Sequence, residues 1–299
     1  MNHIKIKNAY RYCKALASNH YENFPVASWL LPTRLRNPVA AVYAFARTAD
    51  DIADEGNIDA QERYRLLTKM DQQLVDIKTG KVPDTPVFIA LADTIHHFSI
   101  PYQLFHDLLI AFRMDIEKKT YSDFKEILFY CRHSANPVGR SLLYLFNQAT
   151  DHNLLLSDNI CTSLQLINFL QDIQQDLQEN QRVYIPQNDM KQYGISEEIL
   201  LQRAKDCNLD QLIELQISRA WLLLKDGAPL AWKLKGRIKF EIRLIAYGGL
   251  TILRKLYRQG NDKFSRPRLT VTDKLWMLYR AFFGNINDFN LPNLLHHPG

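Results

Sequence analysis

Residues 39–54, VAAVYAFARTADDIAD, are the stretch from which the fold class follows. Small and apolar side chains surround this segment almost completely, which is typical of a helix buried in a protein core. The polar exceptions recur at steps of four, three and four residues and therefore share one helix face: Tyr43, Arg47, Asp50 and Asp54. A charged stripe on a buried helix has to be paired, bound to metal or directed into a polar cavity. The competing interpretation is a solvated last turn in which Arg47 pairs with an aspartate.

A second apolar stretch, residues 164–179, LQLINFLQDIQQDLQE, repeats this pattern. Its polar side chains step by three, four and four residues: Gln165, Asn168, Asp172 and Asp176. Two aspartate pairs on facing helices would form an anionic cage that binds Mg²⁺ together with substrate phosphates. We therefore predict a metal-dependent enzyme that acts on a phosphate or diphosphate ester. A polar, solvent-facing side of an amphipathic helix is the alternative.

The aspartate spacing by itself is a weak signal. Arg203, Asp206 and Asp210 repeat it among polar neighbours that are typical of a wet surface. The apolar helix around each of the other two pairs is what distinguishes them. Beyond the second pair, Arg182 and Tyr184 occupy a predicted loop, in which we expect them to close over phosphate oxygens.

The composition is that of a globular protein. The chain has 299 residues, of which 46% are hydrophobic and 23% charged, and its net charge of +5 is too small to favour nucleic acid. The four cysteines lie far apart, without the CxxC spacing of zinc sites. The sequence shows neither a signal peptide nor an apolar stretch of membrane-spanning length, so we expect a cytoplasmic protein.

Helical periodicity covers most of the chain, and strict apolar alternation does not persist. We predict one all-α domain over residues 1–299. The predicted helices are residues 6–20, 38–55, 59–78, 86–95, 101–115, 122–132, 137–149, 155–178, 196–205, 209–231, 237–257 and 271–282.

Together these motifs resemble the squalene/phytoene synthase family, all-α enzymes that join two prenyl diphosphates head to head. The resemblance covers nearly the whole chain. It rests on His20-Tyr21 with Phe24, Tyr43-x-x-x-Arg47-x-x-Asp50-x-x-x-Asp54, Tyr130 before an NPVG turn, and Gln165-x-x-Asn168-x-x-x-Asp172-x-x-x-Asp176 followed by Arg182-Val-Tyr184. The phrases HYENFPVASWLLP, FARTADDIADEG and HSANPVGR are similar to bacterial hydroxysqualene synthases of hopanoid-type pathways.

The resemblance implies an isoprenoid synthase bundle of about ten to thirteen helices around a central cavity. It implies that about two or three Mg²⁺ ions bind with the diphosphate on Asp50, Asp54, Asn168, Asp172 and Asp176. Catalytic roles would fall to Tyr43, Arg47, Tyr130 and Asn168. Substrate-binding roles would fall to His20, Tyr21, Phe24, Arg47, Gln165, Arg182 and Tyr184. One departure is Asp51, which completes a DDxxD motif typical of head-to-tail prenyl synthases and terpene cyclases, whereas the second motif fits those families poorly.

The reaction that the resemblance implies is ionisation of presqualene diphosphate and capture of the rearranged cation by water, with no nicotinamide cofactor. The alternatives are condensation of two farnesyl diphosphates to presqualene diphosphate or squalene, or of two geranylgeranyl diphosphates to phytoene. A non-catalytic assembly factor is a further alternative, against which the filled metal-ligand positions argue.

Peripheral contact with membrane lipid, at the inner face of the membrane, is also expected. Residues 274–283, KLWMLYRAFF, are bulky and amphipathic, and a basic run precedes them: Lys233, Lys235, Arg237 and Lys239. A capping core helix and a solvated basic face are the competing interpretations. Neighbouring pathway enzymes are the other expected partners.

Overall fold

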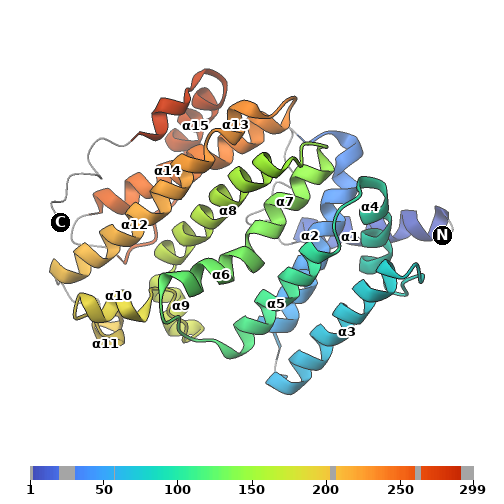
Figure 1. Ribbon diagram of the computed structural model, residues 1–299, viewed down its shortest axis with the longest axis horizontal. Helices are drawn as coiled ribbons and strands as arrows, with labels where there is room; N and C mark the ends of the chain where they lie inside the picture. Colours follow the sequence, from blue (N-terminus) through green and yellow to red (C-terminus); the bar gives the residue numbers. More distant parts are fainter. Residues whose placement is uncertain (1–2, 20–30, 57, 203–206, 260–263, 291–299) are drawn as a thin grey trace. The chain divides into compact units, whose positions relative to one another are not determined.

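Most of the described residues of the chain are helical. The computed structural model describes residues 3–19, 31–56, 58–202, 207–259 and 264–290 (Figure 1). Outside helices and turns, these residues form one isolated β-bridge, between Thr120 and Val183. The all-α class predicted from the sequence is confirmed.

Thirteen α-helices of six or more residues are present in the described part of the chain. They are α1 (His3–Asn19), α2 (Thr33–Asp54), α3 (Ala60–Lys78), α4 (Pro86–Phe98), α5 (Gln103–Glu117), α6 (Phe124–Ser134), α7 (Asn136–Leu145), α8 (Asp151–Gln171), α9 (Ile173–Glu179), α10 (Gln187–Gln192), α12 (Cys207–Gly227), α14 (Ile238–Arg258) and α15 (Val271–Phe283). Shorter elements are α11 (Glu197–Leu201), α13 (Leu230–Lys233) and the 3-10 helix η2 (Ile286–Phe289).

The helices gather into two compact units. The first comprises Met1–Glu117 and Arg132–Leu154, and the second comprises Lys118–Cys131 and Leu155–Gly299. The first therefore carries the aspartates of α2, and the second carries those of α8 and α9. The single domain expected from the sequence stays a prediction.

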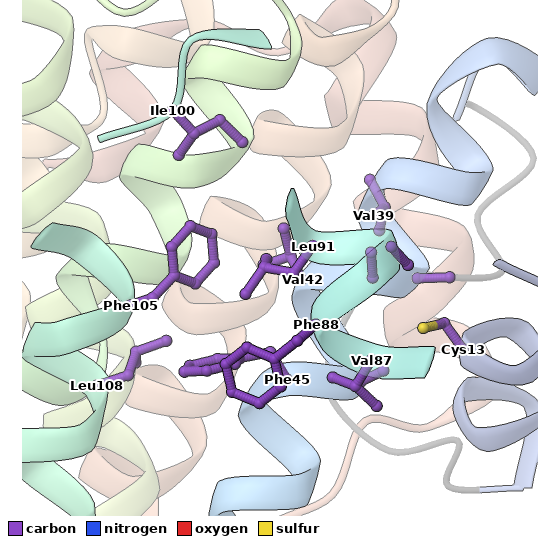
Figure 2. Close-up of a cluster of buried hydrophobic side chains, with 14 of the residues drawn as sticks. Cys13, Val39, Val42, Phe45, Val87, Phe88, Leu91, Ile100, Phe105 and Leu108 are labelled. Carbon is purple, nitrogen blue, oxygen red and sulfur yellow. The ribbon is translucent and has the colours of Figure 1, made fainter. Parts of the chain in front are cut away.

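Helix α2 is the centre of the first unit and packs against α1, α3, α4, α5 and α7. Its alanines Ala40, Ala41 and Ala44 are fully buried, which lets neighbouring helices approach closely. The ring of Phe45 meets Phe88 and Phe105 edge to face, at centroid distances of 5.6 and 5.3 Å (Figure 2). Such edge-to-face pairs add to the hydrophobic free energy of burial. The prediction that residues 39–46 form a buried helix is confirmed.

The second unit is built around α14, which packs against α12, α13 and α15. Close approach of α12 to α8 requires a glycine, because a Cβ atom at Gly227 would lie 2.7 Å from Cγ1 of Ile160. Trp221 of α12 is buried and donates its indole N–H to the carbonyl of Phe289 (2.8 Å), which fixes η2 on this core.

Several predicted helix boundaries are wrong. The predicted helix 155–178 divides into α8 and α9, because Asp172 leaves helical geometry with φ −109° and ψ 13°. The predicted helix 137–149 ends at Leu145, where Asn147 takes a left-handed φ of 56° and its N–H closes a C-terminal turn on Tyr144. Helix α12 ends at Gly227, shortly before the helix-breaking Pro229.

A further difference concerns a short element. Helix α10 was not predicted, because six residues are too few to show a helical period.

No helix among the described residues is long and apolar enough to cross a membrane.

Substituting Phe45→Ala removes a ring that two other rings enclose, so we expect the free energy of unfolding to fall by about 3–5 kcal/mol. Denaturant unfolding followed by far-ultraviolet circular dichroism measures this loss. Val75→Ala on the exposed side of α3 is the control, with an expected change within about 0.5 kcal/mol. Equal losses in both variants would contradict the central position of Phe45.

Candidate active site

The last turn of α2 is a cluster of carboxylates around one guanidinium. Arg47 lies 3.1 Å from Asp50 (Nη1 to Oδ2) and 2.6 Å from Asp51 (Nε to Oδ1), and it also pairs with Glu55. The pairing of Arg47 with an aspartate, which belongs to the competing interpretation of this turn, is therefore present. The cluster remains acidic, because one cation faces three carboxylates and Asp54 follows one turn after Asp50.

A second arginine holds the end of this helix in place. Arg63 of α3 donates to the carbonyls of Ile52 (2.6 Å), Glu55 (3.0 Å) and Gly56 (2.9 Å). These are the C-terminal carbonyls that an α-helix leaves without backbone partners, and a cation there offsets the negative end of the helix dipole. Arg63 therefore compensates part of the cost of placing aspartates at a helix C-terminus.

The charge of this turn is unfavourable even with Arg47 present. Burial, followed by repulsion from the Asp54 carboxylate, raises the pKa of Asp50 to about 6, although Arg47 acts in the opposite direction. A nearby cation would relieve this repulsion.

In the second unit one aspartate lies at the break between α8 and α9 and the other lies one turn later, in α9. Asp172 lies at the break, and its backbone continues the helical pattern: its N–H donates to Asn168 (3.0 Å), and its carbonyl accepts from Asp176 (2.8 Å). The two carboxylates therefore stay one turn apart although the helix is interrupted. Asn168 and Gln165 precede them on α8, both half-buried.

The Asp172 carboxylate forms an ion pair with an arginine from a segment far away in the sequence. The Nε of Arg266 lies 2.6 Å from Oδ1 of Asp172 and its Nη2 lies 3.1 Å from Oδ2, which makes the ion pair bidentate. Gln171 donates to the carbonyl of Pro267 (2.7 Å) and so fixes the same segment on the end of α8. Even so, burial raises the pKa of Asp172, with Arg266 acting in the opposite direction.

The pKa of Asp176 is raised for the same reasons as that of Asp50. Burial, followed by repulsion from Asp172, raises its pKa to about 6. Asn180, Arg182 and Arg266 lower it, but by less. Both units thus contain a carboxylate whose ionised form the fold disfavours.

Aromatic side chains surround the segment that follows Asp176. Tyr184 stacks on Phe169 with 3.8 Å between ring centroids and 5° between planes. Tyr130 lies 5.8 Å from Tyr184 and 6.0 Å from Phe169, and Tyr121 contacts both tyrosines. The sequence-predicted Tyr130 and Tyr184 are thereby brought together.

A small cavity with room for about one water molecule adjoins this cluster. It is lined by Phe169, Ile173, Asp176, Leu177, Arg182, Val183, Tyr184, Ile185 and Leu200. The cavity therefore has no room for a long chain, and its charged lining residues are Asp176 and Arg182.

The predicted site residues therefore fall into three groups. In the first unit Tyr43, Arg47, Asp50 and Asp54 follow one another along α2. In the second unit, the members are Tyr130, Gln165, Asn168, Asp172, Asp176, Arg182 and Tyr184. His20, Tyr21 and Phe24 lie outside the described residues, as do Arg203 and Asp206 of the surface comparison.

Sequence patterns did not reveal Arg63, Arg266, Phe169 or Tyr121. Arg266 lies in a proline-containing segment without periodicity, 94 residues from Asp172. Phe169 belongs to the apolar side of α8 and is indistinguishable there from an ordinary core residue. Arg63 follows an N-cap aspartate, Asp59, like any arginine in a first helical turn.

The donor sets fit Mg²⁺ that arrives with a phosphate ligand. Within the described parts of the chain, no group of three or more His, Cys, Asp or Glu side chains forms a complete metal site. Each unit instead supplies a pair of hard carboxylate groups, and burial raises the pKa of Asp50 in the first unit and of Asp172 and Asp176 in the second. Mg²⁺ commonly binds one or two carboxylates and takes its other ligands from water and phosphate.

Comparison with known proteins identifies relatives. A model of the squalene/phytoene synthase family matches residues 17–274. The chain is 37% identical over 246 residues to a hydroxysqualene synthase from Rhodopseudomonas palustris, and the match covers 82% of each chain.

Two solved structures share the fold. The crystal structure of squalene synthase HpnC from Alicyclobacillus acidocaldarius gives a TM-score of 0.80 at 35% identity, covering 86% of this chain and 96% of that one. A dehydrosqualene synthase in complex with ligand gives 0.81 at 26% identity, with coverages of 93% and 97%. The expected all-α isoprenoid synthase fold is confirmed.

The raised pKa values predict that Asp50→Asn and Asp176→Asn each stabilise the metal-free protein. A folded-state pKa of about 6, against about 3.9 in the unfolded chain, means that the folded state binds the proton more tightly. The free energy of unfolding therefore falls as pH rises from about 4 to 6. At pH 7 the substitution removes the carboxylate charge and recovers this lost stability. We expect Tm to rise by about 2–4 °C per substitution in thermal unfolding with EDTA.

The matched control is Asp273→Asn, which carries the same chemical change with the opposite expected sign. Lys255 and the backbone of Thr270 lower the pKa of Asp273 to about 2, so its ionised form stabilises the fold. Tm should fall in this variant. A shift of the same sign in all three variants would contradict the electrostatic account.

Proposed function

The chain belongs to the squalene/phytoene synthase family, and we propose that it converts presqualene diphosphate into hydroxysqualene in a Mg²⁺-dependent reaction. The carbon–oxygen bond to diphosphate breaks, the cation rearranges, and water adds to it with loss of a proton. No electrons are exchanged with a cofactor. The observation that carries this choice within the family is the 37% identity to a hydroxysqualene synthase over most of both chains.

The family consists of enzymes that bind prenyl diphosphates and are generally metal-dependent. This chain is an enzyme of that kind, which sets aside the non-catalytic alternative. Bound Mg²⁺ would neutralise charge on the leaving diphosphate and so act as a Lewis acid. The residues that would hold it are Asp50 and Asp54 in the first unit, and Asp172 and Asp176 with Asn168 in the second.

The arginines would bind the diphosphate directly. Arg182 is buried beside Asp176 in the small cavity, where a guanidinium donates strong, charge-assisted hydrogen bonds to phosphate oxygens. Arg47 is half-buried and would exchange its carboxylate partners for the diphosphate once a metal neutralises Asp50. Gln165 would orient the same group from α8.

The aromatic cluster would protect the carbocation. Tyr130, Phe169 and Tyr184 present aromatic rings, and each suitably placed aromatic face stabilises a positive charge by roughly 0.5–2 kcal/mol. Tyr43 would do the same from α2, as would His20, Tyr21 and Phe24 near the reacting carbons. This arrangement would confine water to the final capture step.

Condensation of two farnesyl diphosphates is the second candidate. It is favoured by the 35% identity to a protein described as a squalene synthase. Forming squalene requires a hydride donor, whereas forming hydroxysqualene does not. The cytoplasmic location and contact with pathway enzymes stay predictions from the sequence.

Product analysis separates these candidates. Purified protein with Mg²⁺ should convert presqualene diphosphate to hydroxysqualene without a nicotinamide, and ¹⁸O from labelled water should appear in the hydroxyl group. The Asp50→Asn and Asp172→Asn variants should convert the substrate about 10²–10³-fold more slowly. Asp210→Asn, which changes the third copy of the aspartate spacing, should keep the rate of the unchanged protein. Consumption of farnesyl diphosphate with presqualene diphosphate left untouched would overturn the proposal.

The raised pKa values also predict how the Mg²⁺ requirement depends on pH. Protons compete with the metal for Asp50 and Asp176, whose pKa values are about 6, so half-saturation should need more Mg²⁺ as pH falls below 6. The expected change is up to tenfold per pH unit for each proton displaced. Diphosphate release measured at pH 5, 6 and 7 tests this, and a half-saturating concentration that does not change with pH would refute it.

A further inference from the structure

Helix α15 is apolar on two sides, and only one of them is covered by described residues. Its inner side packs on α14: Trp276 meets Tyr247 edge to face at 5.6 Å, and Met277 and Ala281 are buried. The outer side carries large hydrophobic residues with exposures of 40–74%, namely Val271, Leu275, Leu278, Tyr279, Phe282, Phe283 and, just beyond the helix, Ile286. A helix that is apolar nearly all round is normally buried.

This concentration is unusual within the described part of the chain. Sixteen large hydrophobic residues are exposed there, and seven of them lie within residues 271–286. Scattered single residues of this kind are ordinary, whereas a contiguous apolar patch marks an interaction surface. We call these seven residues the outer face of α15.

A basic turn adjoins the outer face. Residues 233–239 run from the last residue of α13 to the second residue of α14, and they contain Lys233, Lys235, Arg237 and Lys239 and no acidic residue. The first three are exposed, and Lys239 lies over the ring of Phe240 with its Nζ 4.9 Å from the centroid. The turn therefore adds a concentrated positive charge to this side of the second unit.

Side-chain contacts beside the basic turn hold α13 and α14 against α15. The rings of Phe240 and Phe282 lie 4.8 Å apart. Arg243 donates to the carbonyl of Ala231 in α13 (3.1 Å) and to that of Ala281 in α15 (3.0 Å), and so ties the two elements together. Helix α15 lies beside α14 in the same unit (Figure 1). The apolar and basic residues thus form one surface.

The acidic groups of this region do not cancel that charge. Asp273 is held by Lys255 at 2.5 Å, and Asp288 is paired with Arg280 and accepts a hydrogen bond from Tyr247 (2.6 Å). Both acids therefore face cations of α14 or α15. The exposed charge next to the outer face remains basic.

We propose that the outer face of α15 and the basic turn together dock the protein on an anionic lipid surface. Leucine and aromatic side chains of an interfacial helix enter the boundary between headgroups and acyl chains, while lysine and arginine attract anionic headgroups. A second copy of the chain is a poorer occupant, because a two-fold interface would bring two basic turns close to each other. No residue of the outer face or of the basic turn is among the proposed metal or diphosphate ligands, so docking does not depend on the proposed reaction.

Vesicle co-sedimentation of the full-length protein tests the proposal. We expect binding to vesicles rich in phosphatidylglycerol, weak binding to pure phosphatidylcholine, and loss of binding at high salt. Leu278→Ser with Phe283→Ser should weaken partitioning at least tenfold. Lys235→Gln with Arg237→Gln should weaken it by roughly 25-fold, about fivefold for each charge removed.

Matched controls carry the same changes elsewhere on exposed positions: Leu155→Ser with Leu222→Ser, and Lys69→Gln with Lys191→Gln. These should bind within about twofold of the unchanged protein, and circular dichroism checks that every variant is folded. Because the charge variant alters no packed side chain, it tests the proposal even if the apolar variant misfolds. Absence of binding to anionic vesicles, or equal losses in controls, would overturn the proposal. So would a dimer in sedimentation equilibrium that Leu278→Ser with Phe283→Ser dissociates.

Discussion

Burial of paired carboxylates one helical turn apart is the constraint on which the candidate site in each unit depends. Asp50 and Asp54 end a helix whose other sides are buried alanines, valines and phenylalanine, and Asp172 with Asp176 interrupts another apolar segment. Water cannot fully solvate these groups, so the pKa values of Asp50 and Asp176 rise to about 6. At neutral pH the folded protein therefore carries an unfavourable charge that a divalent cation would neutralise.

The nearby arginines offset this cost in different ways. Arg63 binds backbone carbonyls, so it fixes the end of α2 without using the carboxylates. Arg47 and Arg266 bind the carboxylates themselves and remain partly exposed. Such side chains can exchange a carboxylate for a phosphate at little cost, because both anions match the guanidinium fork. These contacts fix the end of α2 and the Asp172 carboxylate in place and offset part of the cost of burying the charged groups.

The sequence-based predictions succeeded where periodicity is long. Helix α2 was expected from apolar residues over several turns, and α3, α4 and α14 begin within one residue of their predicted starts. The break at Asp172 escaped prediction, because the residues around it keep a helical period and only the backbone angles change. Short α10 and the contact between Arg266 and Asp172 escaped it as well, since neither produces a repeating pattern.

The sequence alone determined the all-α class, the family and the identity of the aspartate pairs, because helical spacing and motif order are properties of local chain geometry. Only the tertiary structure decided which cation meets which carboxylate, that Tyr184 covers Phe169, and that α15 keeps an apolar side exposed. Those outcomes depend on segments far apart in the chain being packed together. Burial and ion pairing then shift the pKa of each carboxylate, and helix packing decides which apolar surface stays exposed.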